Sequence, residues 1–408
     1  MSIIKNRQYY KFSAYGFLKN LRFFDAFFIL FLVESGMSYT QIGLLYGVRE
    51  IFINAFEIPS GIIADTYGRK TSLIGSLLVY IISFVIFYYS KQFWLFMLAF
   101  ILYGIADAFR SGTHKGMIMD YLKMNEWSDQ KINYYGHTRS WSQKGSAISS
   151  LIAGLLIFFS GQYHSVFLYS IIPYLLNLFL ILTYPKDLNH SFTQKRNSKT
   201  AVIMSIRTLY HTVKLPRVIK IINISALHTA YLKAVKDYIQ PLMVNVALLI
   251  PLMTNTETQK KNGLVIGIIY FFIYLLTSHA SQLSAKIAIR MPKSSPMITL
   301  LLGLSFGLLS GVFYYFNLWV IALLFFIGIY IIENVRKPIL TGYIADQVPS
   351  EILTSVISVQ SLLRTIITAI LALFFGIIAD TYGIGVSFIV ISLFLLILLT
   401  INFVKKAL

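Results

Sequence analysis

Charged side chains occur inside long apolar segments of this chain, where an unpaired charge is expensive. A carboxylate in such a place can carry a proton, because a closed apolar site favours its neutral form. A cation in such a place can hold an anionic group through charge-assisted hydrogen bonds. The chemistry that these residues favour is therefore solute binding and proton transfer.

The carboxylates that we predict as proton carriers are, in order of preference, Asp25, Glu50, Asp107 and Glu333. Each has a basic neighbour within three residues, so permanent ion pairing is the alternative role. For the last two we favour this alternative, in which Arg110 and Arg336 complete gate pairs. For the first two both roles stay open.

The residues predicted to contact a substrate are mostly basic. They are Lys19, Arg22, Arg49, Asn54, Lys233, Lys236, Asp237 and Arg364. An excess of cations favours an anionic group on the solute. The alternative is that the cations neutralise nearby carboxylates and leave a site for a zwitterion or a polar neutral solute.

The seven histidines have no metal-ligand spacing and the chain has no cysteine, so we predict no metal site and no cofactor. His228 is the histidine placed to touch a cavity or a proton path, although a helix-packing hydrogen bond is the favoured role. No nucleotide-binding motif occurs, so ATP is not expected to drive the protein directly.

The elements that must position these residues are apolar and long. Hydrophobic residues make up 57% of the chain and charged residues 12%, with a mean hydropathy of +0.70. Such a composition predicts an all-α membrane protein. We predict twelve spans of about 20 residues each: 12–34, 41–63, 72–89, 93–113, 141–161, 165–184, 220–247, 263–285, 295–315, 317–337, 354–376 and 385–404.

Lysine and arginine are concentrated in alternate loops, which marks the cytoplasmic side and predicts that both termini lie inside. The net charge of +19 follows this pattern, so no nucleic-acid partner is expected. The basic stretch 185–219 is predicted to link two six-helix bundles, 1–184 and 220–408. We interpret it as a tether at the anionic lipid surface, with a short helix near 202–213, rather than as a partner site.

The octapeptide Gly-Ile-Ile-Ala-Asp-Thr-Tyr-Gly occurs twice, at 61–68 and at 376–383. Both copies are predicted as tight turns between spans, on opposite faces of the membrane. A second repeat places an acidic residue and an arginine in the tenth span 226 positions after those in the fourth (107 to 333, 110 to 336). Parallel repeats of this kind are typical of transporters with a site between their halves.

The first octapeptide continues into two basic residues, and together they resemble the signature loop of the major facilitator superfamily. The twelve predicted spans and the basic central loop extend this resemblance over the chain. It implies alternating access and a substrate cavity between the halves, where Arg22 and Lys236 resemble a pair that binds phosphorylated or carboxylated solutes. It also implies a conformational latch formed by Gly61, Asp65, Gly68, Arg69 and Lys70. Gly61 is expected to allow close helix packing, and no latch role is expected for the second copy.

We therefore predict a monomeric secondary transporter in the cytoplasmic membrane that moves a small polar solute, with an anionic group favoured, and that is coupled to protons. A proton-driven drug or metabolite efflux antiporter is one alternative, weakened because Phe100 stands where many drug antiporters have an arginine. A non-cycling membrane sensor is another, and the intact latch argues against it. An enzyme is not expected, because no nucleophile–base pair is evident.

Overall fold

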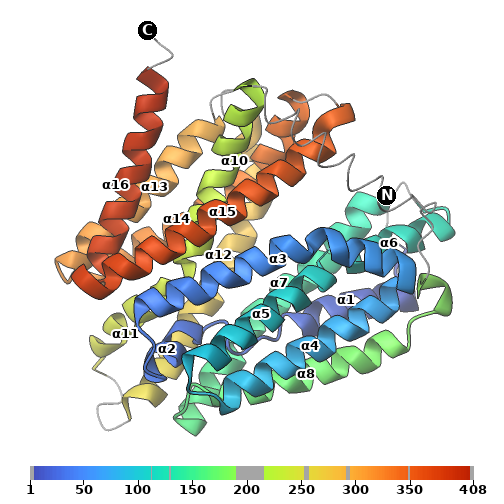
Figure 1. The fold of residues 1–408 in the computed structure, drawn as a ribbon, viewed down its shortest axis with the longest axis horizontal. Coiled ribbons are helices and arrows are strands. Elements are labelled where there is room, and N and C mark those ends of the chain that lie inside the picture. Colours follow the sequence, from blue (N-terminus) through green and yellow to red (C-terminus); the bar gives the residue numbers. More distant parts are fainter. Residues whose placement is uncertain are drawn as a thin grey trace. The chain divides into compact units, whose positions relative to one another are not determined.

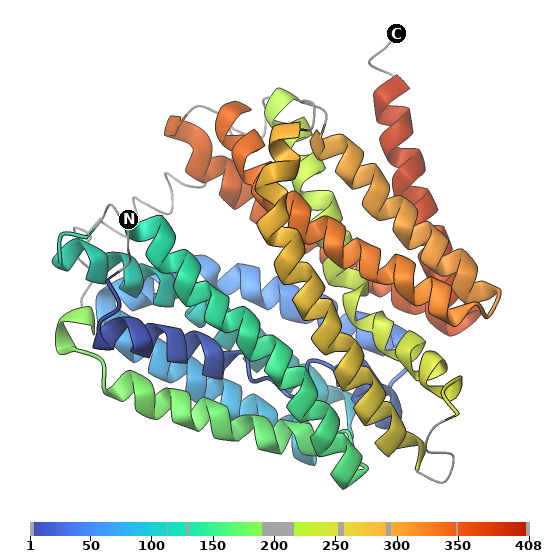
Figure 2. The same cartoon turned by 180° about the vertical axis from the view of Figure 1, so that it is seen from behind.

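The computed structural model contains two compact helical units, drawn in Figure 1 and from behind in Figure 2. It describes residues 4–111, 113–127, 130–189, 216–251, 257–290, 295–347 and 350–404. Within these residues every regular element is a helix, as expected. The predicted surface helix near 202–213 and most of the linker lie outside the described residues.

The first unit contains residues 1–28, 48–202 and 256–271. Its helices are α1 (Arg7–Lys19), α4 (Arg69–Tyr89), α5 (Phe93–Arg110), α6 (Thr113–Met124), α7 (Lys131–Ser160), α8 (Ser165–Leu182) and the short 3₁₀ helix η2 (Lys186–Asn189). It also holds the larger part of α3 (Tyr39–Tyr67) and the beginning of α12 (Thr258–Arg290). Helix α4 packs against α5 and α8, and α1 packs against α7 (Figure 1).

The second unit contains residues 29–47, 203–255 and 272–408. Its helices are α2 (Phe28–Glu34), α10 (Pro216–Val235), η3 (Lys236–Tyr238), α11 (Ile239–Leu248), α13 (Ser295–Tyr315), α14 (Trp319–Gln347), α15 (Ser350–Tyr382) and α16 (Ile384–Val404). Helix α13 packs between α14 and α16, and α10 packs against α15. The units follow the two halves of the sequence except that 29–47 and 256–271 each group with the other half.

Eight helical segments of the described chain are long and apolar enough to cross a membrane. They are Arg69–Tyr89, Phe93–Met124, Tyr134–Ser160, Ser165–Leu182, Thr258–Ala280, Pro296–Tyr315, Trp319–Lys337 and Val359–Tyr382. Helix α3 is long enough but is less apolar, because Arg49, Glu50 and Asn54 lie in its middle. Helix α16 has a shorter apolar stretch. The count of twelve spans stays a prediction.

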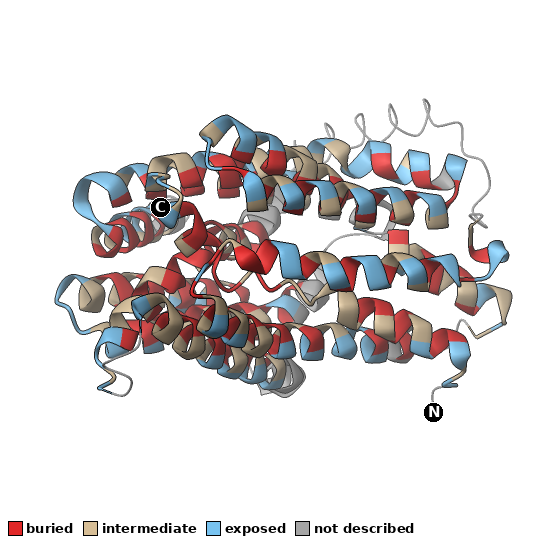
Figure 3. Ribbon diagram, turned by 90° about the horizontal axis from the view of Figure 1, so that it is seen from below, coloured by how far each residue is buried: buried red, intermediate tan, exposed pale blue. Residues whose placement is uncertain are grey.

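Large apolar side chains cover the outward faces of the helices, where a soluble bundle would place polar ones. Phe159 is 77% exposed and Phe179 is 62% exposed. Figure 3 shows exposed residues alternating with buried ones along the helices, which is the pattern of helices with one face turned outward. Apolar outward faces suit contact with lipid chains, so the surface agrees with a membrane-embedded protein.

The predicted span 12–34 is not a single helix, because the backbone leaves the helical conformation between Lys19 and Phe28. Other groups compensate for the lost helical hydrogen bonds, as an apolar surrounding requires. The amide of Phe23, for example, donates to Ser170 Oγ at 3.1 Å. The predicted span 220–247 is likewise interrupted, by η3. The two interruptions correspond in the repeat, since Lys236 lies 214 positions after Arg22.

The prediction that both octapeptide copies are tight turns is wrong for most of each copy. Both copies form the ends of helices. Helix α3 continues to Tyr67, and α15 continues to Tyr382. The chain turns only at the last glycine of each copy, with φ of +99° at Gly68 and +87° at Gly383. This region of backbone conformation favours glycine, so the predicted role of Gly68 is confirmed.

The two copies differ in their surroundings. Among the described residues, a side chain at Gly61 would meet no atom within 4 Å, so the close packing expected there is not observed. A side chain at Gly376 would collide with the Tyr39 carbonyl. The Asp380 carboxylate accepts the amides of Tyr39 and Thr40 at 2.8 Å each, and thereby caps α3. The second copy, for which no latch role is expected, therefore ties α15 to the beginning of α3. The side chain of Asp65 lies outside the described residues.

A pair of matched substitutions tests this difference. Gly376→Ala is expected to destabilise the protein by about 1–3 kcal/mol, because the added methyl group overlaps the backbone of α3. Gly61→Ala is the control in the identical octapeptide, and it is expected to be neutral or stabilising by up to about 1 kcal/mol, because alanine favours a helix. Thermal unfolding in detergent measures both, and equal effects would contradict the packing described.

Candidate functional site

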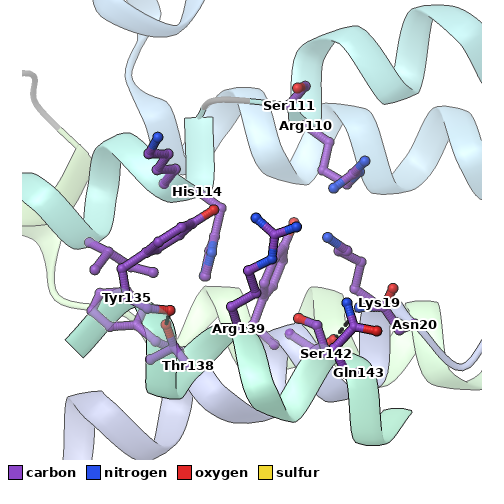
Figure 4. A pocket seen from close by; sticks show the side chains of 15 residues that line it. Lys19, Asn20, Arg110, Ser111, His114, Tyr135, Thr138, Arg139, Ser142 and Gln143 are labelled. Atoms are coloured by element: carbon purple, nitrogen blue, oxygen red, sulfur yellow. Dashed lines mark hydrogen bonds between the residues drawn. The ribbon is translucent and has the colours of Figure 1, made fainter. Parts of the chain in front are cut away.

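A pocket of about 480 Å³ opens within the first unit, where α1, α5, α6 and α7 meet (Figure 4). Its cationic side chains are Lys19, Arg110, Lys115 and Arg139. Its uncharged polar side chains include Asn20, Thr138, Ser142 and Gln143. Figure 4 shows Lys19, Arg110 and Arg139 pointing into the same space from three different helices.

The pocket has an unbalanced positive charge. None of its lining residues is an aspartate or a glutamate. Arg110 is partly neutralised by Asp107, which lies behind it on α5. Within the described part of the chain, the Lys19 ammonium makes no hydrogen bond or ion pair with a side chain, and Arg110 and Arg139 are close enough to repel it. An anion placed between these groups would relieve that repulsion.

The arrangement is suited to a solute with a phosphate or carboxylate group. Ammonium and guanidinium groups form the strongest hydrogen bonds to such oxyanions. The amides of Asn20 and Gln143 and the hydroxyl of Ser142 can bond the uncharged polar parts of the same solute. The pocket therefore offers both charged and uncharged polar groups to one solute.

Helix ends bring these side chains together. Lys19 is the last residue of α1, and Arg110 is the last residue of α5. Arg139 lies in the first half of α7, which packs along α1. The break after Lys19 thus lies at the edge of the pocket, which Lys19 and Asn20 line.

Sequence reasoning found part of this pocket. Lys19 was predicted to contact substrate, whereas Arg110 was predicted as half of a gate pair. Lys115 and Arg139 were missed, because basic residues near the ends of spans were interpreted as topology signals. The polar residues Tyr135, Arg139 and Ser142 recur at helical spacing, and this stripe is the signal that could have revealed the pocket.

Three of the four predicted proton carriers lie next to an arginine. Asp25 is 2.9 Å from Arg22, as its spacing in the sequence predicted, and Arg22 also donates to the Tyr103 hydroxyl. Glu50 is buried and lies 3.5 Å from Arg49.

In α5, the predicted pairing of Asp107 with Arg110 is present in the structure. The Tyr80 hydroxyl also donates to the carboxylate, at 2.6 Å. Asp107 is therefore held by a permanent cation and by a neutral donor.

The predicted pair of Glu333 with Arg336 is wrong. Arg336 is fully buried and donates to the carbonyls of Pro296 and Ile224 and to the Thr299 hydroxyl. Glu333 instead lies 2.7 Å from His228 Nδ1. The carbonyls that accept from the arginine lie in the first turn of α13 and in the middle of α10, so its side chain joins α14 to both helices.

The remaining predicted substrate residues do not line this pocket. Asn54 lies on α3 and Lys233 on α10. Lys236 Nζ is 3.5 Å from Asp237 Oδ1, and Arg364 Nη2 donates to the Ser361 hydroxyl at 2.9 Å. Arg22 and Lys236 belong to different units, and their predicted shared cavity stays a prediction.

The basic end of the latch motif is bonded within the first unit. Arg69 Nη1 is 2.6 Å from Asp120 Oδ2, and both side chains are largely buried. Lys70 Nζ donates to the carbonyls of Leu182 and Tyr184 at 2.8 and 3.1 Å. These contacts fasten the beginning of α4 to α6 and to the end of α8.

Among the described residues, no group of histidine and carboxylate side chains has the geometry of a metal site.

The model of the Major Facilitator Superfamily matches residues 17–366. The chain belongs to this family. Its members are membrane transporters, so this protein is a secondary transporter and not an enzyme.

A relative and two solved structures agree with this assignment. The Bacillus subtilis protein named uncharacterized MFS-type transporter YxaM is 24% identical over 399 residues, which cover 95% of this chain and 93% of the relative. The crystal structure of nucleoside transporter NupG is similar with a TM-score of 0.76, at 13% identity, and covers 98% of this chain and 99% of its own. Peptide transporter POT in complex with sulfate gives 0.69 at 14% identity, with coverage of 96% and 94%. At these identities the structures show a shared fold.

The ion pair at the latch allows a double-mutant test. Arg69→Gln or Asp120→Asn alone is expected to destabilise the protein by about 3 kcal/mol, because each removes one member of a largely buried ion pair. The double variant is expected to lose less than the sum of the two single effects. Thermal unfolding in detergent measures all three, and strictly additive losses would show that the pair is not coupled.

Proposed function

We propose that this transporter moves a small polar organic solute with an anionic group, by alternating access and with coupling to protons. The supporting observation is the pocket in which three cationic side chains converge without a lining carboxylate. A neutral solute would leave the mutual repulsion of these cations in place, whereas an anionic group would relieve it. The anionic solute is therefore favoured over the zwitterion or neutral alternative.

The wider arrangement belongs to the same proposal. It consists of twelve spans in two six-helix bundles, 1–184 and 220–408, with the basic linker and both termini in the cytoplasm. In this orientation the ends of α5 and α7 that form the pocket face the cytoplasmic side. The solute would then meet the pocket when the cytoplasmic side is open.

Proton coupling is supported by the buried carboxylates. A transporter that moves an anion against the membrane potential needs an energy source, and a proton bound at a site that contains a buried carboxylate supplies it. The energy source proposed here is accordingly the proton gradient.

Electrical recording from proteoliposomes tests the proposed function. Purified protein is challenged with a pool of carboxylated and phosphorylated metabolites, with and without an imposed pH gradient. The expected result is a current from the anionic pool that depends on the gradient. A current from a neutral or cationic pool alone would contradict the proposed substrate class.

Variants of the pocket sharpen this test. Lys19→Gln and Arg139→Gln are each expected to weaken the apparent affinity for the active pool about tenfold or more, because each removes a charged hydrogen bond of about 1.5–3 kcal/mol. Lys144→Gln is the control on the same helix, since Lys144 lies over the Trp141 ring and outside the pocket. Unchanged affinity in both pocket variants would refute the anion site.

A further inference from the structure

The two repeat-related acidic residues have different partners. In α5, Asp107 is held by Arg110 three residues later. In α14 the spacing is identical, but Arg336 is taken by two carbonyls and a hydroxyl, and Glu333 bonds to His228 on α10. The same sequence pattern thus forms a fixed ion pair in one unit and a histidine–carboxylate pair in the other.

Because the two acidic residues have different partners, they differ in whether the pair can bind and release a proton. A guanidinium keeps its charge at every physiological pH, so Asp107 is held as an anion. An imidazole gains and loses its proton near neutral pH, so the pair in α14 has two accessible charge states. A histidine therefore gives this site a function that an arginine cannot provide.

The pair is closed off from solvent. The side chains of His228 and Glu333 are 0% and 2% exposed. His228 Nδ1 faces Glu333 Oε2, while Thr229 Oγ1 donates to Oε1 at 2.8 Å. His228 Nε2 is buried and has no hydrogen-bond partner among the described residues. It lies against Gly303 of α13, where any larger residue would overlap the ring.

The charged groups around the pair come from few elements. Helix α14 contributes Arg336 and also Lys337, whose Nζ is 3.8 Å from Glu333 Oε1 and whose side chain is 53% exposed. Helices α11 and α13 contribute no charged residue. On α15, which packs against α10, Arg364 is bonded to Ser361. On η3, Lys236 lies beside Asp237.

The surroundings of His228 act in opposite directions on the protonation of its ring. Burial opposes a positive charge on His228 most strongly, the Glu333 carboxylate favours that charge, and the two cations of α14 oppose it. A site that is balanced in this way can both take up and release a proton as its surroundings change. Asp107 lacks that balance, because its own arginine cannot give up a charge.

We propose that His228 and Glu333 form the proton-binding site through which this transporter couples solute movement to the proton gradient. The proposal rests on the proposed function, and it selects one of the four predicted carboxylates. Loading forms one N–H bond at Nε2 with a proton that water delivers when a conformational change of the transport cycle opens the site, and release breaks that bond. Glu333 remains the anionic acceptor of the Nδ1 proton, and no electron is exchanged.

Proton uptake by the purified full-length protein tests the site without any solute. A pH indicator in weakly buffered detergent solution reports protons bound when the pH is lowered through the range in which imidazoles titrate. Wild type is expected to bind about one proton per molecule more than Glu333→Gln or His228→Gln. Asp107→Asn is the repeat-matched control and is expected to keep the wild-type uptake. Equal uptake by wild type and Glu333→Gln would overturn the proposal.

Histidine NMR gives a second readout that does not depend on the stability of the Glu333 variant. In ¹⁵N-histidine-labelled wild type, the signal that disappears in His228→Gln identifies the ring. This signal is expected to change protonation state with pH. A His228 ring that stays in one state throughout the range would overturn the proposal.

The current from the anionic metabolite pool separates this inference from the proposed function. Loss of gradient-driven current in Glu333→Gln, with the wild-type current present, supports both. Gradient-driven current that persists in Glu333→Gln overturns the coupling role of the pair and leaves the anion transport intact. A wild type that binds the proton but gives no current from the pool contradicts the proposed function and keeps the proton site.

Discussion

A charged side chain among apolar helices needs a counter-charge or hydrogen-bond partners. This requirement determines most of the polar contacts between the helices of this structure. Removing a charged group from water costs several kcal/mol, and only a close counter-charge or several hydrogen bonds offset it. Arg69 and Asp120 meet this need across two helices, and Arg336 meets it with backbone carbonyls. Such fixed partners fasten helices to one another. They are structural, and they leave little freedom to exchange a proton or bind a solute.

At two sites in the described residues, charged groups are not held in fixed ion pairs. We propose a function for each of these two sites. At the basic pocket, cations converge without a lining carboxylate, and only Arg110 has a counter-charge close behind it, so a ligand can supply the rest of the compensation. At the His228–Glu333 pair, the partner is a group whose charge can change. The first arrangement is suited to an anion and the second to a proton. Within a family whose members share one fold, differences of this kind in particular sites determine what is carried.

The sequence predicted the helical architecture, the family and the turn at Gly68, because apolar length and a glycine at a left-handed position are local properties. It did not predict the break after Lys19. An apolar pattern fixes which residues are buried and not where the backbone leaves the helix. The repeat also led to a wrong prediction for Arg336, which was expected to pair with Glu333 as Arg110 pairs with Asp107. Its choice of partner depends on carbonyl groups from α10 and α13, which are distant in the sequence.

The basic pocket is the feature on which the proposed substrate class depends, and anomalous diffraction can test it directly. Crystals of the full-length protein soaked with tungstate, a heavy oxyanion, would show where a tetrahedral anion binds. Our account predicts anomalous density between Lys19, Arg110 and Arg139, and its loss in the Lys19→Gln variant. Density confined to surface residues such as Lys144, with none in the pocket, would contradict it.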